Sequence, residues 1–300
     1  MPGTIGIATD ADGGVSVAIA RPHPDLQSYV TFFYVVECAK PLTDFLYPEL
    51  GNVRFALSGN WMVRMPGFRN ETPQTAALFG PTDRHGAITT RGGKCIGFGL
   101  TPIGWNRLIG SNASLMANRV QPLGMQLGVD GEWLRTQLIA INDDAGRMDF
   151  LERVVCDLLK KRPPVDEKIL TIDRALRTRP DDVVAFAETI GVSDRTLHRL
   201  CLHTFGFAPK RMMRLQRFLD MLGSVRSAVG AGVRASIGDD YYDQSHFYRD
   251  FRDFMAMSPR KYFRDPRHLM AAAAEAQVRA DVTLSFRMPP QPGELGEALI

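Results

Sequence analysis

The strongest constraint on the fold is a change in residue pattern after about residue 105. From Leu26 to about Trp105 the chain consists of short β-branched and aromatic runs separated by turn residues, which is typical of a small sandwich or barrel. After Gly104 apolar residues recur every three or four positions, which indicates helices. A chain of 300 residues with this change is expected to form more than one domain, with an α+β fold.

Within residues 1–105 we expect a β-rich domain with an N-terminal arm. Residues 29–36 form a continuous β-branched and aromatic run. Residues 53–57 and 61–65 flank a Ser-Gly-Asn turn, which predicts a β-hairpin. The first 20 residues are rich in Gly, Ala and Asp and show little periodicity, so we expect them to form a loose arm.

Residues 106–162 are expected to form a helical linker or dimerisation segment. The stripe from Leu151 to Leu159 has helical spacing, and it either packs internally or contributes to a dimer, which we favour slightly. Two lysines and an arginine followed by Pro163-Pro164 end this helix and predict an interdomain linker. After residue 267 we expect a C-terminal tail, residues 268–300, with an Ala-rich helix at its start.

The clearest functional pattern lies at residues 163–267. A helix is predicted after Asp182, then a turn at Gly191-Val192-Ser193, then a second helix from Asp194. The second helix has two faces: apolar residues point inward, and three basic residues share the opposite side at spacing i, i+3, i+4. The inward residues are Leu197, Leu200 and Cys201, and the basic residues are Arg195, His198 and Arg199.

A second pattern of the same kind follows at residues 241–254. Phe247, Phe251 and Phe254 are expected to face inward, and Arg249 occupies the place that Arg199 has in the first pattern. A long helix between the two patterns carries four basic residues on its polar side. Two such helices on one rigid body could meet successive faces of the DNA major groove, about 34 Å apart.

Residues 166–267 resemble the C-terminal domain of the AraC/XylS family of transcription regulators. The matching residues are Phe186-Ala187, Gly191, Ser193, Leu197-His198-Arg199, Gly206, Pro209, Tyr242-Asp243-Gln244-Ser245-His246-Phe247, Arg249, Phe251, Ser258-Pro259 and Tyr262. The resemblance implies an all-α double helix-turn-helix domain in which helices 194–205 and 244–254 read DNA. We expect DNA contacts from Ser193, Arg195, Thr196, His198, Arg199, Gln244, Ser245, His246 and Arg249, with phosphate contacts from Lys210, Arg211, Arg214 and Arg217.

The chain also departs from the family pattern. Asp240 and Ala256 stand where the family usually has glycine, and Cys201 replaces a usual phenylalanine. Ala235-Ser236 replaces a usual Leu-Ala pair. Because Ala enters the left-handed region less readily than Gly, we expect the second unit to be less well formed than the first. We expect this second unit either to contribute mainly phosphate contacts or to dock only on DNA.

The β-rich half more faintly resembles the cupin-like sensor halves that accompany such domains. The resembling segments are residues 22–30 and 97–104. The resemblance implies binding of a small molecule or dimerisation. Four aromatic residues either pack in the core, which we favour, or line a ligand pocket: Tyr34, Phe55, Trp61 and Phe98.

Composition excludes several other classes. The four cysteines form no CxxC pair, which favours reduced thiols in a cytoplasm. No apolar run approaches the roughly 20 residues that span a bilayer, and the N-terminus does not look like a secretory signal. The β-rich half has only His23 and His85 as histidines, and we find no catalytic motif, so we expect neither a metal, nor a cofactor, nor an enzyme.

Charge fits this interpretation without proving it. The chain has a net charge of +3, and residues 166–267 alone hold 18 Lys and Arg against 14 Asp and Glu. We therefore predict a cytoplasmic, homodimeric transcription activator that binds double-stranded DNA. Its other expected partners are an unknown small-molecule effector and RNA polymerase. The alternative is a β-barrel small-molecule-binding protein or enzyme with a degenerate helix-turn-helix domain that acts through protein interaction.

Overall fold

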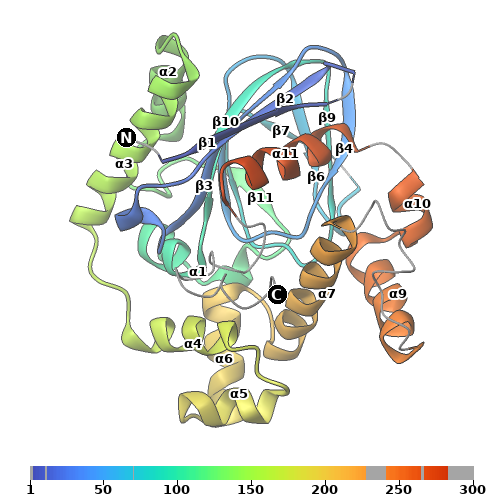
Figure 1. The fold of residues 1–300 in the computed structure, drawn as a ribbon. Coiled ribbons are helices and arrows are strands. Elements are labelled where there is room, and N and C mark those ends of the chain that lie inside the picture. Colours follow the sequence, from blue (N-terminus) through green and yellow to red (C-terminus); the bar gives the residue numbers. More distant parts are fainter. Residues whose placement is uncertain (1–2, 11, 70, 228–240, 265–266, 283–300) are drawn as a thin grey trace.

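The computed structural model describes most of the chain. The described residues are 3–10, 12–69, 71–227, 241–264 and 267–282, without the side chains of 223–227, 241–245 and 263–264. Strands occupy the N-terminal part as far as Pro122, and helices follow (Figure 1). The expected β-rich N-terminal half and helical C-terminal part are confirmed.

Two antiparallel sheets build the N-terminal half. The first has the order β1-β2-β3-β10-β5-β8-β11 and the second β4-β9-β6-β7. The strands of the first sheet are β1 (Ile5–Thr9), β2 (Val15–Ala20), β3 (Val30–Cys38), β5 (Asn52–Ala56), β8 (Ala76–Phe79), β10 (Gly93–Leu100) and β11 (Val120–Pro122). Those of the second are β4 (Leu42–Leu46), β6 (Trp61–Arg64), β7 (Thr72–Gln74) and β9 (Gly86–Thr90).

Two sequence-based expectations for this half were wrong. The first 20 residues are not a loose arm, because β1 and β2 pair from Ile5↔Ala20 to Thr9↔Ser16. The alternation of Val15, Val17 and Ile19 buries one face of β2, a signal hidden by the small residues between them. The expected hairpin of residues 53–57 and 61–65 is also absent, since β5 pairs with β8 and β10 whereas β6 pairs with β7 and β9.

Helices cover the outer face of the seven-stranded sheet. Leu151, Val155 and Leu159 of α3 are buried in the same core cluster as Phe55 and Phe98 of the sheet. These three residues of the stripe therefore pack internally, and a dimer contact through this segment stays a prediction. The elements of this segment are η1 (Pro24–Leu26), α1 (Pro102–Gly104), η2 (Trp105–Ile109), η3 (Ala113–Leu115), α2 (Gly131–Ala140) and α3 (Asp144–Lys161).

The helical C-terminal part follows Pro163-Pro164. Its first three helices pack around a small core that includes Ile172, Phe186 and Leu197. The later helices share a larger core with the strands of the N-terminal half. The helices are α4 (Glu167–Arg177), α5 (Val183–Ile190), α6 (Asp194–Phe205), α7 (Pro209–Ser227), α9 (Tyr241–Met255), α10 (Pro259–Arg264) and α11 (His268–Arg279).

Helix α11 returns to the N-terminal half and lies across the seven-stranded sheet at β1 and β2 (Figure 1). Gly6 makes this approach close, because a Cβ atom at that position would lie 2.0 Å from the carbonyl oxygen of Ala276. The start of the predicted tail is therefore a packed structural element. The rest of the predicted tail, from residue 283, lies outside the described residues.

Candidate functional site

Local hydrogen bonds fix the orientation of helix α6. Gly191 ends α5 with a φ of 72°, a left-handed conformation that suits glycine. Ser193 then caps α6, where its side chain accepts from the backbone N–H of Thr196 at 3.4 Å. The predicted turn at 191–193 and the helix from Asp194 are both present.

Helix α6 has one buried face and one exposed basic face. The side chains of Leu197 and Cys201 are fully buried, so the helix cannot rotate without breaking its core. On the other side Arg195, His198 and Arg199 are exposed. Of the other two predicted contacts on this helix, Ser193 is exposed and Thr196 is half-buried.

The C-terminal end of α6 abuts the N-terminal half. At Gly206, whose φ is 88°, a Cβ atom would lie 2.7 Å from the side chain of Pro81 and 3.3 Å from the carbonyl oxygen of Ala113. Asn112 and Ser114 border a hollow of about 370 Å³ together with the basic residues of α6. The helix is thus held at its C-terminal end. The basic residues of its first two turns are exposed to solvent across a hollow that the N-terminal half borders.

Helix α9 also has one buried face and one exposed face, although fewer of its side chains are described. Its inward residues Phe247, Phe251 and Phe254 are buried around Phe218 of α7, with ring centroids 5.1–6.0 Å from that ring. His246 and Arg249 are exposed on the other side. Gln244 and Ser245 belong to the helix, but their side chains lie outside the described part of the structure.

The four basic residues expected to contact phosphate divide into two pairs. Lys210 and Arg217 are exposed. Arg211 forms ion pairs with Asp83 at 2.6 Å and with Asp253. Arg214 pairs with Asp250 at 2.5 Å and with Asp253 at 3.2 Å. In this conformation Arg211 and Arg214 therefore hold α7 to its neighbours and are not presented to solvent as free charges.

One departure from the family pattern has a direct structural counterpart. Ala256 ends α9 with a φ of 48°, the left-handed conformation that glycine adopts more easily. Cys201 fills its position without exposure to solvent. Asp240 and Ala235-Ser236 lie outside the described residues.

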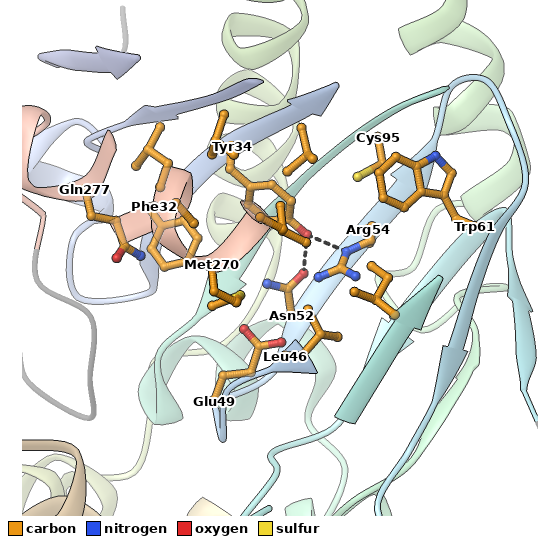
Figure 2. Close-up of a pocket in the computed structure, with 16 residues that line it drawn as sticks. Phe32, Tyr34, Leu46, Glu49, Asn52, Arg54, Trp61, Cys95, Met270 and Gln277 are labelled. Atoms are coloured by element: carbon orange, nitrogen blue, oxygen red, sulfur yellow. Dashed lines mark hydrogen bonds between the residues drawn. The ribbon is translucent and has the colours of Figure 1, made fainter. Parts of the chain in front are cut away.

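A second candidate site is a cavity of about 80 Å³ between the two sheets, closed on one side by α11 (Figure 2). Tyr34 and Trp61 line this cavity, as expected of a pocket. Phe55 and Phe98 do not; they lie in the core cluster on the outer face of the sheet. The reason is the alternation of strand side chains, which places Arg54 on the cavity side and its neighbour Phe55 on the other.

The polar residues of the cavity were not identified from the sequence. Arg54 Nε donates to the hydroxyl of Tyr34 at 2.9 Å, and that hydroxyl donates to Asn52 Oδ1 at 2.8 Å. Burial raises the pKa of the nearby Glu49 carboxyl to about 7, although the positive charge of Arg54 opposes this. The available signal in the sequence was the charged Arg54 between the apolar residues Val53 and Phe55 of one strand.

The described residues contain one group that could offer three metal ligands, Asp10, Asp12 and His268. Asp10 already accepts from the N–H of Val15 at 2.8 Å and lies 2.7 Å from the ring nitrogen of His268. These contacts of Asp10 with Val15 and His268 hold the start of α11 against the N-terminal half.

Burial raises the pKa of the Cys95 thiol to about 11, which keeps it protonated at neutral pH. No helix in the described ranges is long and apolar enough to cross a membrane.

Comparison with known proteins found solved structures but no sequence relatives. No family model matches the chain, and no curated protein matches it. Apo ToxT K231A from Vibrio cholerae strain SCE256 is 9% identical, covers 78% of this chain and 96% of its own, and gives a TM-score of 0.43. The AraC-like transcriptional activator CuxR is 13% identical, with 72% and 86% covered and a TM-score of 0.34.

A ToxT structure with an unsaturated fatty acid bound is 10% identical, with 75% of this chain and 95% of that chain covered and a TM-score of 0.39. Identities and scores this low describe a distant likeness. The chain is similar to an AraC-like regulator, the family that its C-terminal motifs resemble.

Proposed function

We propose that this protein is a transcription regulator that binds double-stranded DNA through helix α6, with α9 in support. The observation that carries the proposal is the fixed basic face of α6: Arg195, His198 and Arg199 are exposed, while the opposite face is locked into the core by Leu197 and Cys201. A helix of this kind fits the major groove, which is about 12 Å wide.

The exposed basic residues of α6 lie at the end that such a helix uses. Reading helices contact bases mainly with their N-terminal residues, and the basic residues of α6 lie in its first two turns. There they are exposed beside a hollow that Asn112 and Ser114 of the N-terminal half border, whereas the other end of the helix abuts Pro81. Arginine can bond the O6 and N7 atoms of guanine with two parallel hydrogen bonds. Arg195 and Arg199 supply this chemistry, and Ser193 adds a hydroxyl for a phosphate or base.

The test is a fluorescence-anisotropy titration of the full chain against DNA from upstream of its own gene and against a scrambled duplex. Arg199→Ala is expected to weaken binding to the specific site by about 1–3 kcal/mol and to reduce the preference over scrambled DNA. Arg153→Ala is the matched control, because Arg153 is an exposed arginine on α3, in the N-terminal half. Equal effects of the two substitutions would contradict the proposal.

A second candidate function has support in helix α9. Ala256 adopts a left-handed conformation, and Arg211 and Arg214 are engaged by acidic residues. In this second function, the helix-turn-helix unit that contains α9 contacts another protein and does not contact DNA bases. Arg249→Ala separates the two functions: weaker DNA binding favours base or phosphate contact, and unchanged binding favours a protein-interaction role.

The cavity between the sheets gives the proposed regulator a place for a small-molecule effector. It is mostly apolar and carries a buried arginine, which are features of small-molecule sites. Homodimer formation, contact with RNA polymerase, activation as opposed to repression, and a cytoplasmic location remain predictions. A non-enzymatic role fits this proposal.

A further inference from the structure

The cavity between the sheets has walls from two distant parts of the chain. One side consists of strand residues from the two sheets, which include Tyr34, Arg54 and Trp61. The opposite side is α11, which contributes Leu269, Met270, Ala273 and Gln277. Figure 2 shows Gln277 and Arg54 at opposite ends of the pocket, with Phe32, Tyr34 and Met270 between them.

Arg54 is an unusual residue for such a place. Its side chain is only 5% exposed, and its Nη1 atom is buried without a hydrogen-bond partner among the described residues. A buried cation without full hydrogen bonding is unfavourable by several kcal/mol unless something compensates it. Its guanidinium lies 4.6 Å from the ring centroid of Phe79, which offers only partial compensation.

The Glu49 carboxyl neutralises the positive charge of Arg54 only in part. Glu49 lines the same cavity, and burial raises the pKa of its carboxyl to about 7. Since such a group is about half protonated at neutral pH, it leaves part of the Arg54 charge without a counter-ion. On the α11 side, Gln277 is 3% exposed and its Oε1 atom has no partner within the described part of the chain.

We propose that the cavity binds a compact monocarboxylate, whose carboxylate pairs with Arg54 and whose apolar body lies against Tyr34 and Met270, and that α11 is the cover that encloses it. This inference deepens the proposed function and rests on it only for the consequence at DNA. Arginine and a carboxylate form the charge-assisted, two-pronged pair that a buried guanidinium favours.

The size of the cavity limits the ligand. A cavity of about 150 Å³ holds benzene, and this one is about 80 Å³. A ligand with a few heavy atoms therefore fits beneath α11 with little adjustment. A longer chain has to displace Leu269 and Met270 of the cover, so affinity is expected to fall as the chain lengthens.

Contacts outside the cavity hold the cover in place. The Asp44 carboxylate accepts from the N–H groups of Leu269 at 2.9 Å and Met270 at 3.3 Å. Gly6 permits the close approach of the Ala276 carbonyl. Because α11 follows α9 and α10 in the chain, a ligand that stabilises its docking also fixes the end of the helical part to the β-rich part.

The experiment is isothermal titration calorimetry of the full chain with acetate, propionate, butyrate and octanoate, and with propan-1-ol as the neutral counterpart of propionate. We expect propionate or butyrate to bind most tightly, and propan-1-ol to bind at least about tenfold more weakly than propionate. Arg54→Met should weaken propionate binding by a similar factor, and Arg54→Lys should recover part of it. Circular dichroism of both variants verifies that they are folded.

The cover is tested in the same samples by hydrogen–deuterium exchange of residues 268–279, which propionate is expected to slow. Gly6→Ala should speed this exchange and weaken propionate binding severalfold. Gly14→Ala is the matched control, because a Cβ atom there would meet only the Lys40 side chain at 3.7 Å. Failure of all the acids to bind, equal affinity for acid and alcohol, strongest binding of octanoate, or a Gly6→Ala variant with released α11 and unchanged affinity would each overturn the proposal.

These measurements contain no DNA. A chain that binds propionate as described but fails to bind DNA would contradict the proposed function and leave the ligand site supported. A chain that binds DNA but none of the acids would contradict the ligand site alone.

Discussion

The Glu49 carboxyl gives a prediction whose size follows from its surroundings. Burial raises its pKa from the ordinary value of 4.5 to about 7 in the folded chain, while in the unfolded chain it returns to the ordinary value. The folded state therefore holds a proton that the unfolded state releases between these two pH values. The contribution to stability is greatest below about pH 4.5, falls as the pH rises, and is lost above about pH 7.

A pKa difference of this size corresponds to about 3 kcal/mol between the two ends of this range. Glu49→Gln removes the titration. We expect the variant to gain about 1–3 kcal/mol relative to the parent chain when the pH is raised from 4.5 to 8. Urea unfolding followed by tryptophan fluorescence at both pH values measures the difference, and Glu71→Gln, at an exposed glutamate, is the control.

The comparison of variants at two pH values cancels the titration of other groups that both chains share. If the stability difference between Glu49→Gln and the parent chain were the same at pH 4.5 and pH 8, the carboxyl would titrate normally. The cavity would then be wetter than its geometry indicates, and the argument that Arg54 lacks a permanent counter-ion would fail.

Three further substitutions test other parts of the account. Ala256→Gly relieves a left-handed alanine, so urea unfolding should show a gain of about 1 kcal/mol; a loss would mean that the backbone there is not strained. Asp44→Ala removes the acceptor at the start of α11, so hydrogen exchange at 268–279 should accelerate, and unchanged exchange would contradict the anchoring role. Leu197→Ala empties a fully buried position in the small helical core and should cost about 2–5 kcal/mol together with DNA binding; unimpaired stability would place that core elsewhere.

Features set by neighbouring residues were predictable from the sequence. The turn at Gly191 and Ser193 and the split faces of α6 follow from capping chemistry and helical spacing, which act over a few residues. The inward position of Phe247, Phe251 and Phe254 has the same origin. These predictions needed no knowledge of the distant chain.

Features set by distant residues were not predictable in the same way. Residues 58–60 look like a hairpin turn, yet the chain passes there from one sheet to the other, because β5 finds its partners in β8 and β10. The position of α11 depends on Gly6, a contact 270 residues away in the chain. For Phe55 the favoured core position is confirmed, whereas Arg54 was not predicted to line a pocket, although strand alternation allows only one of these two neighbours to face the cavity.

The most direct test of the central claim is a salt titration of DNA binding by the full chain. Lysine and arginine contacts to phosphate release counter-ions, so affinity for the upstream duplex should fall at least about tenfold between 50 and 200 mM salt. Arg195→Ala or Arg199→Ala should weaken the binding at every salt concentration. Absence of binding at 50 mM, or binding that is insensitive to salt and to both substitutions, would contradict the account.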